Sequence, residues 1–154
     1  MENLMHRHTP TLTVFDPRGL SVRAVTWYRA VPQETAQARV TVQSYDPVGR
    51  LSRQWDPRLF AAWQQDATVE PNQTTVYSLS GQALRTDNVD AGWQTQLSGD
   101  MGQLLGSWDG RGSHNRVDYD ALLRPTAYFE QAEGADERCR ERLLYAATAL
   151  EDRS

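Results

Sequence analysis

The residues of this chain that could take part in catalysis are mainly aspartates. A pair of carboxylates can act as the acid and the base of a glycoside hydrolase. The candidates are Asp16, Asp46, Asp56, Asp87, Asp90, Asp118 and Asp120. Nearly all of them fall in expected turns or helix caps, where aspartate accepts hydrogen bonds from backbone amides. We therefore predict that these carboxylates stabilise turns, that the segment has no catalytic residue and that it is not an enzyme.

Histidine and cysteine offer little further chemistry. His6 and His8 have a spacing found in some metal sites, but they lie in an expected loose arm without a second cluster of ligands. His114 follows a glycine-rich turn and is expected at the surface or at a strand edge. Cys139 is the single cysteine, so no intrachain disulfide can form, and we predict that it lies in a packed or partly covered site. We expect no metal and no cofactor.

Glycine, serine and aromatic residues suggest turns and packing more than binding sites. The spacing of Gly106, Gly110 and Gly112 is not that of a phosphate-binding loop. Ser80-Gly81 and Ser98-Gly99 do not belong to a G-x-S-x-G nucleophile motif. The five tryptophans and six tyrosines are interpreted as packing between hairpins, with a carbohydrate-binding face as the alternative.

Composition excludes several classes of partner. The 154 residues are 39% hydrophobic with a mean hydropathy of −0.67, which predicts a thin core. A net charge of −4 and the absence of lysine argue against nucleic acid. No apolar run approaches the roughly 20 residues that cross a bilayer, so no direct membrane insertion is expected. The N-terminus lacks the apolar region of a Sec signal, which predicts synthesis in the cytoplasm and any export by another route.

A short repeated cassette organises the sequence: an aromatic residue, an acidic or hydroxyl residue, two further residues, and glycine. Its copies are Phe15-Asp16-Pro17-Arg18-Gly19, Tyr45-Asp46-Pro47-Val48-Gly49 and Tyr77-Ser78-Leu79-Ser80-Gly81. Tyr119-Asp120 begins another copy, but Leu123 stands where glycine is expected. Because leucine resists a positive φ, that turn must be built differently or be strained. The turn at Gly99–Gly102 is interpreted as having a different spacing.

Alternating polar and apolar residues predict β-hairpins around these turns. The strands are expected at 11–15, 20–29, 38–45, 51–55, 74–79, 83–87, 93–97, 104–108 and 115–120. A change of phase predicts a bulge near Ala24-Val25. Asp56 and Pro57 suit the N-cap and first residue of a helix of about two turns. The fold class is therefore mainly β, with one or two short helices.

The C-terminal segment fits two structures. An amphipathic helix after Asp136 would place several apolar residues on one face, namely Cys139, Leu143, Ala146, Ala147 and Leu150. Arg142–Tyr145 could instead form a strand that leads into another repeat.

Longer phrases carry a family resemblance. The run Tyr45-Asp46-Pro47-Val48-Gly49-Arg50-Leu51 resembles the signature of RHS/YD-repeat proteins. Further phrases resemble, in the same order, toxin-complex C subunits, the TccC-like proteins of bacterial insecticidal toxins. They are residues 8–20, Asp56–Phe60, Asp90–Gly92 and Glu141–Tyr145. The repeat-motif residues are assigned as Phe15, Asp16, Gly19, Tyr45, Asp46, Gly49, Arg50, Tyr77, Gly81, Tyr119 and Asp120.

The resemblance implies serial YD-repeat hairpins forming part of a large curved RHS sheet. In the family, that sheet and a B subunit form a hollow shell around a C-terminal toxin, which autoproteolysis releases. Residues 11–154 would be an incomplete RHS/YD-repeat domain after a flexible arm at 1–10, contributing wall strands but no cleavage. The resemblance also favours a strand at Arg142–Tyr145.

The expected partner is a B-type subunit or the remainder of the shell, with possible self-association through exposed sheet edges. The expected location is outside the bacterial cell, as part of a secreted toxin complex. The alternative is a stand-alone binding module that presents YD-repeat hairpins to glycans or host surfaces.

Overall fold

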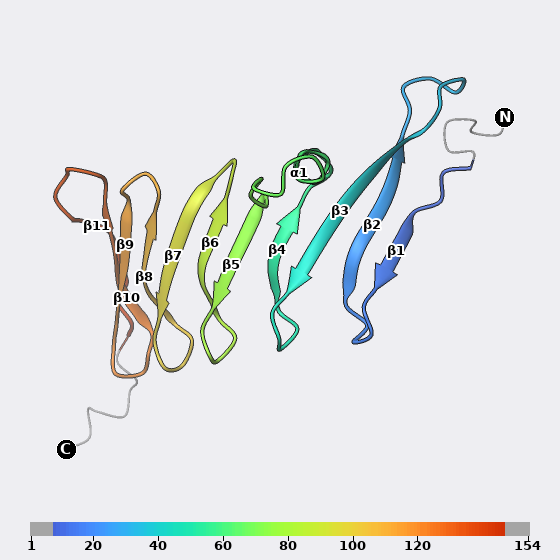
Figure 1. Ribbon diagram of the computed structural model, residues 1–154. Coiled ribbons are helices and arrows are strands. Elements are labelled where there is room, and N and C mark those ends of the chain that lie inside the picture. Colours follow the sequence, from blue (N-terminus) through green and yellow to red (C-terminus); the bar gives the residue numbers. More distant parts are fainter. Residues whose placement is uncertain (1–7, 147–154) are drawn as a thin grey trace, which may run out of the picture. The chain divides into compact units, whose positions relative to one another are not determined.

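The computed structural model describes residues 8–146, and the fold is mainly β, as predicted (Figure 1). The strands are β1 (Leu12–Phe15), β2 (Ser21–Tyr28), β3 (Gln37–Tyr45), β4 (Leu51–Trp55), β5 (Gln73–Tyr77), β6 (Ala83–Asn88), β7 (Gly92–Ser98), β8 (Leu104–Asp109), β9 (His114–Tyr119), β10 (Pro125–Gln131) and β11 (Arg138–Arg142). The described part has one helix, α1 (Pro57–Trp63), between β4 and β5. At the C-terminus the structure has the strand β11 and no helix up to residue 146; residues 147–150 of the expected helix lie outside the described part.

The strands fall into two compact units, Met1–Gly92 and Trp93–Ser154. In the first unit, β1 to β6 pair antiparallel in chain order. In the second, β7 to β11 do the same. Each unit is therefore a series of hairpins, and no long crossover connection is needed. The assignment of 11–154 as one incomplete domain stays a prediction.

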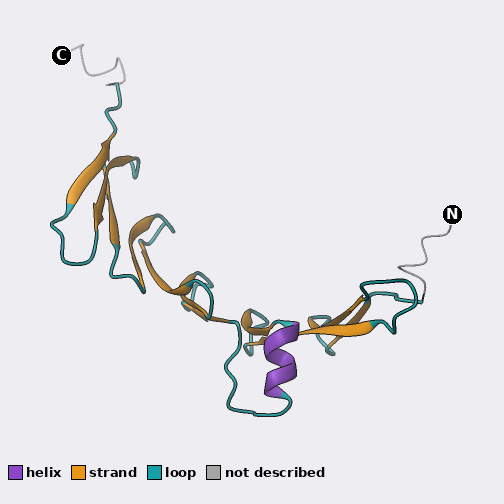
Figure 2. Cartoon of the chain, turned by 90° about the horizontal axis from the view of Figure 1, so that it is seen from above, coloured by secondary structure: helices purple, strands orange, loops and turns teal. Residues whose placement is uncertain are grey.

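The helix α1 forms where Asp56 and Pro57 predicted it. The Asp56 carboxylate accepts a hydrogen bond from the Leu59 amide at 2.8 Å, and Pro57 begins the helix. Phe60 is buried against the sheet, and the guanidinium of Arg23 lies 5.5 Å from its ring centre. Figure 2 shows α1 standing on one face of the strands around it. The helix thus covers β3 and β4 and supplies the main buried side chain of the first unit.

The core is thin, as the composition predicted. Among the described residues the buried hydrophobic side chains are Phe60, Val117 and Ala127. Large apolar side chains such as Trp27 and Val76 remain 38% and 51% exposed. Since each unit is mostly a single sheet layer, its strands are held chiefly by their neighbours along the sheet and by the connecting turns.

The predicted bulge lies at a different place. Ala24 and Val25 pair in continuous register with β3, whereas the register of β1 and β2 shifts between Val14 and Phe15. Val14 pairs with Arg23 and Phe15 with Ser21, so the extra residue is Val22. The change of phase in the sequence therefore arises from the turn at the start of β2 and not from the middle of the strand.

Candidate functional site: a ladder of closed turns

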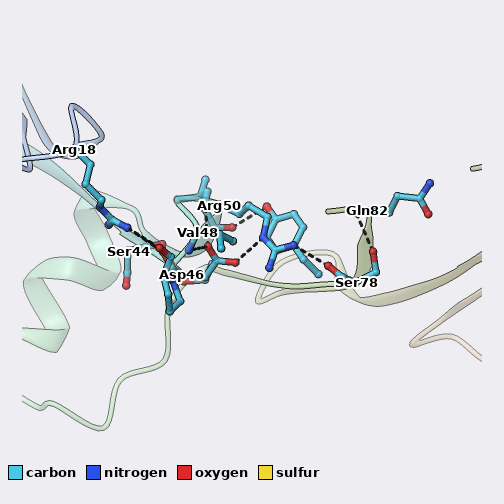
Figure 3. A network of polar contacts seen from close by, with 11 residues as sticks. Arg18, Ser44, Asp46, Val48, Arg50, Ser78 and Gln82 are labelled. Carbon is cyan, nitrogen blue, oxygen red and sulfur yellow. Dashed lines mark hydrogen bonds and ion pairs between the residues drawn. The ribbon is translucent and has the colours of Figure 1, made fainter. Parts of the chain in front are cut away.

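The turn between β3 and β4 shows how the cassette is built. The Asp46 amide donates to the Arg50 carbonyl at 2.9 Å, and the Gly49 amide donates to the Asp46 carbonyl at 3.0 Å. The Asp46 carboxylate accepts from the amides of Val48 and Arg50 at 3.0 and 2.8 Å and from Arg50 Nε at 2.6 Å (Figure 3). Gly49 has φ 89°, which a residue without Cβ adopts readily. A single carboxylate therefore closes the whole turn.

Three other aspartate turns repeat these bonds. The turns are 16–20, 109–113 and 120–124, and in each the first and fifth residues and the fourth and first residues are joined by backbone bonds. In each, the carboxylate of the first residue accepts the amides of the third and fifth at 2.9 to 3.0 Å. The aspartate at 109 was interpreted only as part of a glycine-rich turn; its signal is the glycine three residues later, as at Asp16 and Asp46.

Two turns keep the backbone pattern without an aspartate. In the turn 78–82, Ser78 Oγ accepts the Gln82 amide at 3.1 Å. The turn 99–103 has the same backbone bonds, so its interpretation as a different spacing was wrong. There Gln103 Oε1 accepts the Met101 amide at 3.1 Å, and a Cβ on Gly99 would lie 2.3 Å from Gln103 Nε2. The glutamine side chain occupies the space that the aspartate fills elsewhere.

The turn at Leu123 is built like the others. The Leu123 amide donates to the Asp120 carbonyl at 2.9 Å, and Leu123 has φ 58°. Of the two alternatives raised by the sequence, the second holds: leucine adopts the left-handed conformation that glycine adopts in the other turns, at a cost of about 1–2 kcal/mol.

Tyrosine hydroxyls join successive hairpins. In the first unit, Tyr45 donates to the Ser21 carbonyl at 2.8 Å and Tyr77 to the Leu51 carbonyl at 2.9 Å. The acceptor is the residue five positions after the start of the preceding turn. It lies just before an unpaired bulge residue, because the register shifts beside both turns. Each tyrosine thus reads the end of the preceding turn.

The second unit repeats these bonds. Tyr119 donates to the Leu104 carbonyl at 2.7 Å and Tyr145 to the Pro125 carbonyl at 2.9 Å. Both acceptors again lie five positions after the start of a turn, beside a register shift. Sequence reasoning missed Tyr145 because the acidic residue and the glycine do not follow it; the available signal was a tyrosine one hairpin after Tyr119.

Arginines add a second set of links. Arg18 Nη1 donates to the Asp46 carbonyl at 3.2 Å, and Arg50 Nη1 donates to the Ser78 carbonyl at 2.7 Å (Figure 3). The guanidinium of Arg50 also lies 4.9 Å from the Tyr77 ring centre. In the first unit each turn is therefore bonded to the next by a side chain that its own aspartate holds in place.

The turn carboxylates are poorly suited to proton transfer. The Leu20 amide lowers the pKa of Asp16, and the Arg124 amide lowers the pKa of Asp120. For Asp46, burial raises the pKa, but the Arg50 amide and guanidinium outweigh it and the pKa is lowered overall. A general acid needs a raised pKa to hold its proton near neutral pH. These groups are instead acceptors that stay charged.

The other candidate aspartates lie in two kinds of place. Asp56 caps α1, and Asp90 forms an ion pair with Arg58 at 3.4 Å. Asp87 and Asp118 lie within β6 and β9, where arginines two residues earlier on the same strand face pair with them. The expectation of turn or cap roles was therefore wrong for these two, because their spacing places each beside an arginine on the sheet surface.

Histidine and cysteine occupy surface positions. His114 begins β9, as expected for a strand edge, and stacks on Trp108 with ring centres 4.8 Å apart. Cys139 is exposed, so its expected cover was wrong; β11 pairs with β10 on one side in the described chain. Within residues 8–146 no group of three or more His, Cys, Asp or Glu could hold a metal ion. The described helix is also too short and too polar to cross a membrane.

Comparison with known proteins identifies similar segments in toxin subunits. No family model matches the chain. The toxin subunit YenC1 of Yersinia entomophaga is 34% identical over 152 residues, which are 96% of this chain and 16% of that subunit. The subunit YenC2 of the same organism is 28% identical over 171 residues, covering 100% of this chain and 17% of that subunit.

Solved structures match the fold. The crystal structure of TcdB2-TccC3 without its hypervariable C-terminal region has a TM-score of 0.87 at 31% identity, over 95% of this chain and 7% of that chain. The Tc holotoxin pore of Photorhabdus luminescens gives a TM-score of 0.85 at 33% identity, over 95% and 7%. The chain is thus homologous to a small part of much longer toxin-complex proteins, and it shares their fold over that part.

Proposed function

We propose that this chain is a non-catalytic wall segment of a toxin-complex shell of the RHS/YD-repeat type. The single observation that carries the proposal is the ladder of turns. Each turn is closed by its own first or fifth side chain, and tyrosine hydroxyls bond to the end of the preceding turn in both units. Such a series extends a sheet by repetition and concentrates its polar side chains on building the sheet.

The proposed partner is a B-type component, and the proposed cargo is a toxin enclosed by the completed shell. Support comes from the similar structures, in which TccC3 accompanies TcdB2. In the described residues, β1 and β11 each pair on one side only, so each offers backbone groups to a further strand. The same edges would allow self-association when a partner is missing. A secreted toxin complex would place the segment outside the cell.

Co-expression with TcdB2 tests the proposal. We expect the chain to co-elute with TcdB2 in size-exclusion chromatography and to form larger self-associated species when expressed alone. A chain that stays monomeric and does not bind TcdB2 would contradict the shell role. Replacing Asp16, Asp46 or Asp120 by asparagine should abolish no enzymatic activity, because these carboxylates serve turn amides.

A glycan-binding module is the second candidate. It is favoured by partly exposed tryptophans, since Trp27, Trp63 and Trp108 are 38%, 39% and 38% exposed and an indole ring can stack on a sugar. A glycan array probed with the purified chain separates the two functions. Binding that W108A abolishes, without any effect of TcdB2 co-expression on its oligomeric state, would favour the module.

A further inference from the structure

The turn 120–124 differs from the other closed turns in what it exposes. Leu122 and Leu123 are 73% and 43% exposed, side by side at the tip of the hairpin formed by β9 and β10. In the other turns of this pattern the fourth residue is Gly19, Gly49, Gly81, Gly102 or Gly112, each with φ between 75° and 92°. Leu123 takes the same backbone region at φ 58°.

This leucine is costly twice over. A side chain in left-handed backbone strains the turn, and an exposed leucine leaves apolar surface in water. Glycine would avoid both costs and keep every hydrogen bond of the turn, because those bonds are made by Asp120 and by backbone groups. Strained residues in loops persist where the surroundings or a function require them.

The polar groups around the tip are already occupied. The Asp120 carboxylate accepts from the amides of Leu122 and Arg124 and from Arg124 Nε. The Arg124 guanidinium also lies 4.4 Å from the Tyr145 ring centre. No free cation is therefore offered beside the leucines to a lipid or nucleic-acid phosphate. What the tip presents is apolar area on a rigid, internally satisfied turn.

We propose that Leu122 and Leu123 form an anchor that inserts into an apolar, uncharged pocket of the B-type component. The inference rests on the proposed function, which supplies the partner. A rigid turn that carries adjacent leucines loses little conformational freedom on binding, and buried apolar anchors contribute most of the affinity of such contacts. The strain of Leu123 is then retained because the complex uses its side chain.

The test measures affinity for TcdB2 and thermal stability of the full chain. The variants are L122S and L123G, with V48S as the matched control: Val48 is 74% exposed and holds the third position of its own turn, as Leu122 does. We expect L122S to weaken binding by about tenfold and V48S to leave it within about twofold of wild type. L123G should weaken binding as well, yet raise the melting temperature by about 2 °C because the strain is relieved.

Each outcome decides between readings. Wild-type binding that L122S and L123G leave unchanged overturns the anchor and keeps the proposed function. An equal loss in V48S means general stickiness of apolar tips and also overturns it. A lower melting temperature for L123G means that Leu123 packs within its own chain. If the wild-type chain does not bind TcdB2, the proposed function fails first. Flotation with phosphatidylcholine–phosphatidylglycerol vesicles that L122S abolishes, with TcdB2 binding intact, would assign the tip to a membrane.

Discussion

Two edges of the second unit carry turns with the same hydrogen bonds but different surroundings. The turns 99–103 and 120–124 lie at one edge, and the turn 109–113 lies at the other. At the first edge the register shifts beside each turn, and a tyrosine from the next hairpin bonds to the carbonyl just before the shift. At the second edge β8 and β9 pair without a shift, and Trp108 stacks on His114 of its own hairpin.

The difference separates two tasks that the sequence motif combines. Closing a turn requires an acceptor for its amides and a residue that tolerates left-handed backbone, and both edges have them. Joining one hairpin to the next requires a bulge and a tyrosine, and in the second unit only the first edge has both. The bulge interrupts the ladder and leaves a carbonyl for the hydroxyl. Asp109 shows that the closed turn does not depend on this connection.

Acid should have the largest effect, because it acts on both edges at once. Hydrogen bonds from amides lower the pKa of Asp16, Asp109 and Asp120 below the usual 3.8, and the pKa of Asp46 is lowered despite its burial. Near pH 3.8 the unfolded chain then binds more protons than the folded one. The stabilisation is complete above pH 3.8 and is lost as pH falls through the lowered folded values.

Thermal melts between pH 5 and pH 2.5 check this expectation. The melting temperature should be level down to about pH 4 and then fall steeply. The variant D46N should melt lower at pH 5 and lose less on acidification, since one titrating acceptor is gone. A melting temperature that rises on acidification would show that these carboxylates do not stabilise the folded turns.

A β-branched residue at a left-handed position should break one closed turn. Replacing Gly49 by valine places Cβ and two methyls at φ 89°, so we expect a loss of about 2 kcal/mol or more in the free energy of unfolding. Urea unfolding followed by tryptophan fluorescence measures it. The control G106A alters a strand glycine of β8, and should cost less, about 0.5–1 kcal/mol; equal losses would mean that backbone conformation is not the cause.

The tyrosine links can be removed without disturbing the turns. In Y119F the hydroxyl that bonds to the Leu104 carbonyl is lost, and we expect destabilisation of about 1 kcal/mol. Hydrogen exchange should quicken at the β7–β8 turn that Tyr119 contacts. The amides of Arg111 and Ser113, at the opposite edge, should keep their protection. Faster exchange at both edges would mean that Tyr119 supports the sheet generally and does not join particular hairpins.

Much of this architecture was predictable from local sequence. Proline and glycine around Asp16 and Asp46 fixed the turns, alternation fixed most strands, and Asp56-Pro57 fixed the start of α1. Local patterns failed where the cause is a neighbour along the sheet. The helical periodicity after Asp136 lost to pairing with β10, and Cys139 is exposed because β11 is covered on one side only in the described residues. Apolar spacing does not reveal which strand lies beside which.

The turn 99–103 shows the same limit at the scale of one side chain. Its closing acceptor comes from the fifth residue, Gln103, and not from the first, so the motif is invisible although the geometry is present. A search for aspartate and tyrosine alone therefore misses it. The identity of the acceptor matters less than its position relative to the amide of the third residue.

That interpretation predicts the smallest and most specific effect. In the double variant G99D/Q103R, aspartate should accept the amides of Met101 and residue 103, and arginine should pair with it as Arg50 does with Asp46. We expect stability equal to wild type or higher by up to about 1 kcal/mol. The single variant G99D should be less stable than the double variant, since its Cβ meets the Gln103 side chain. Because the comparison is between single and double variants, it reports the coupling of the two positions. If the double variant is clearly less stable than G99D, the two acceptors are not interchangeable and the turns at the two edges are less alike than their hydrogen bonds indicate.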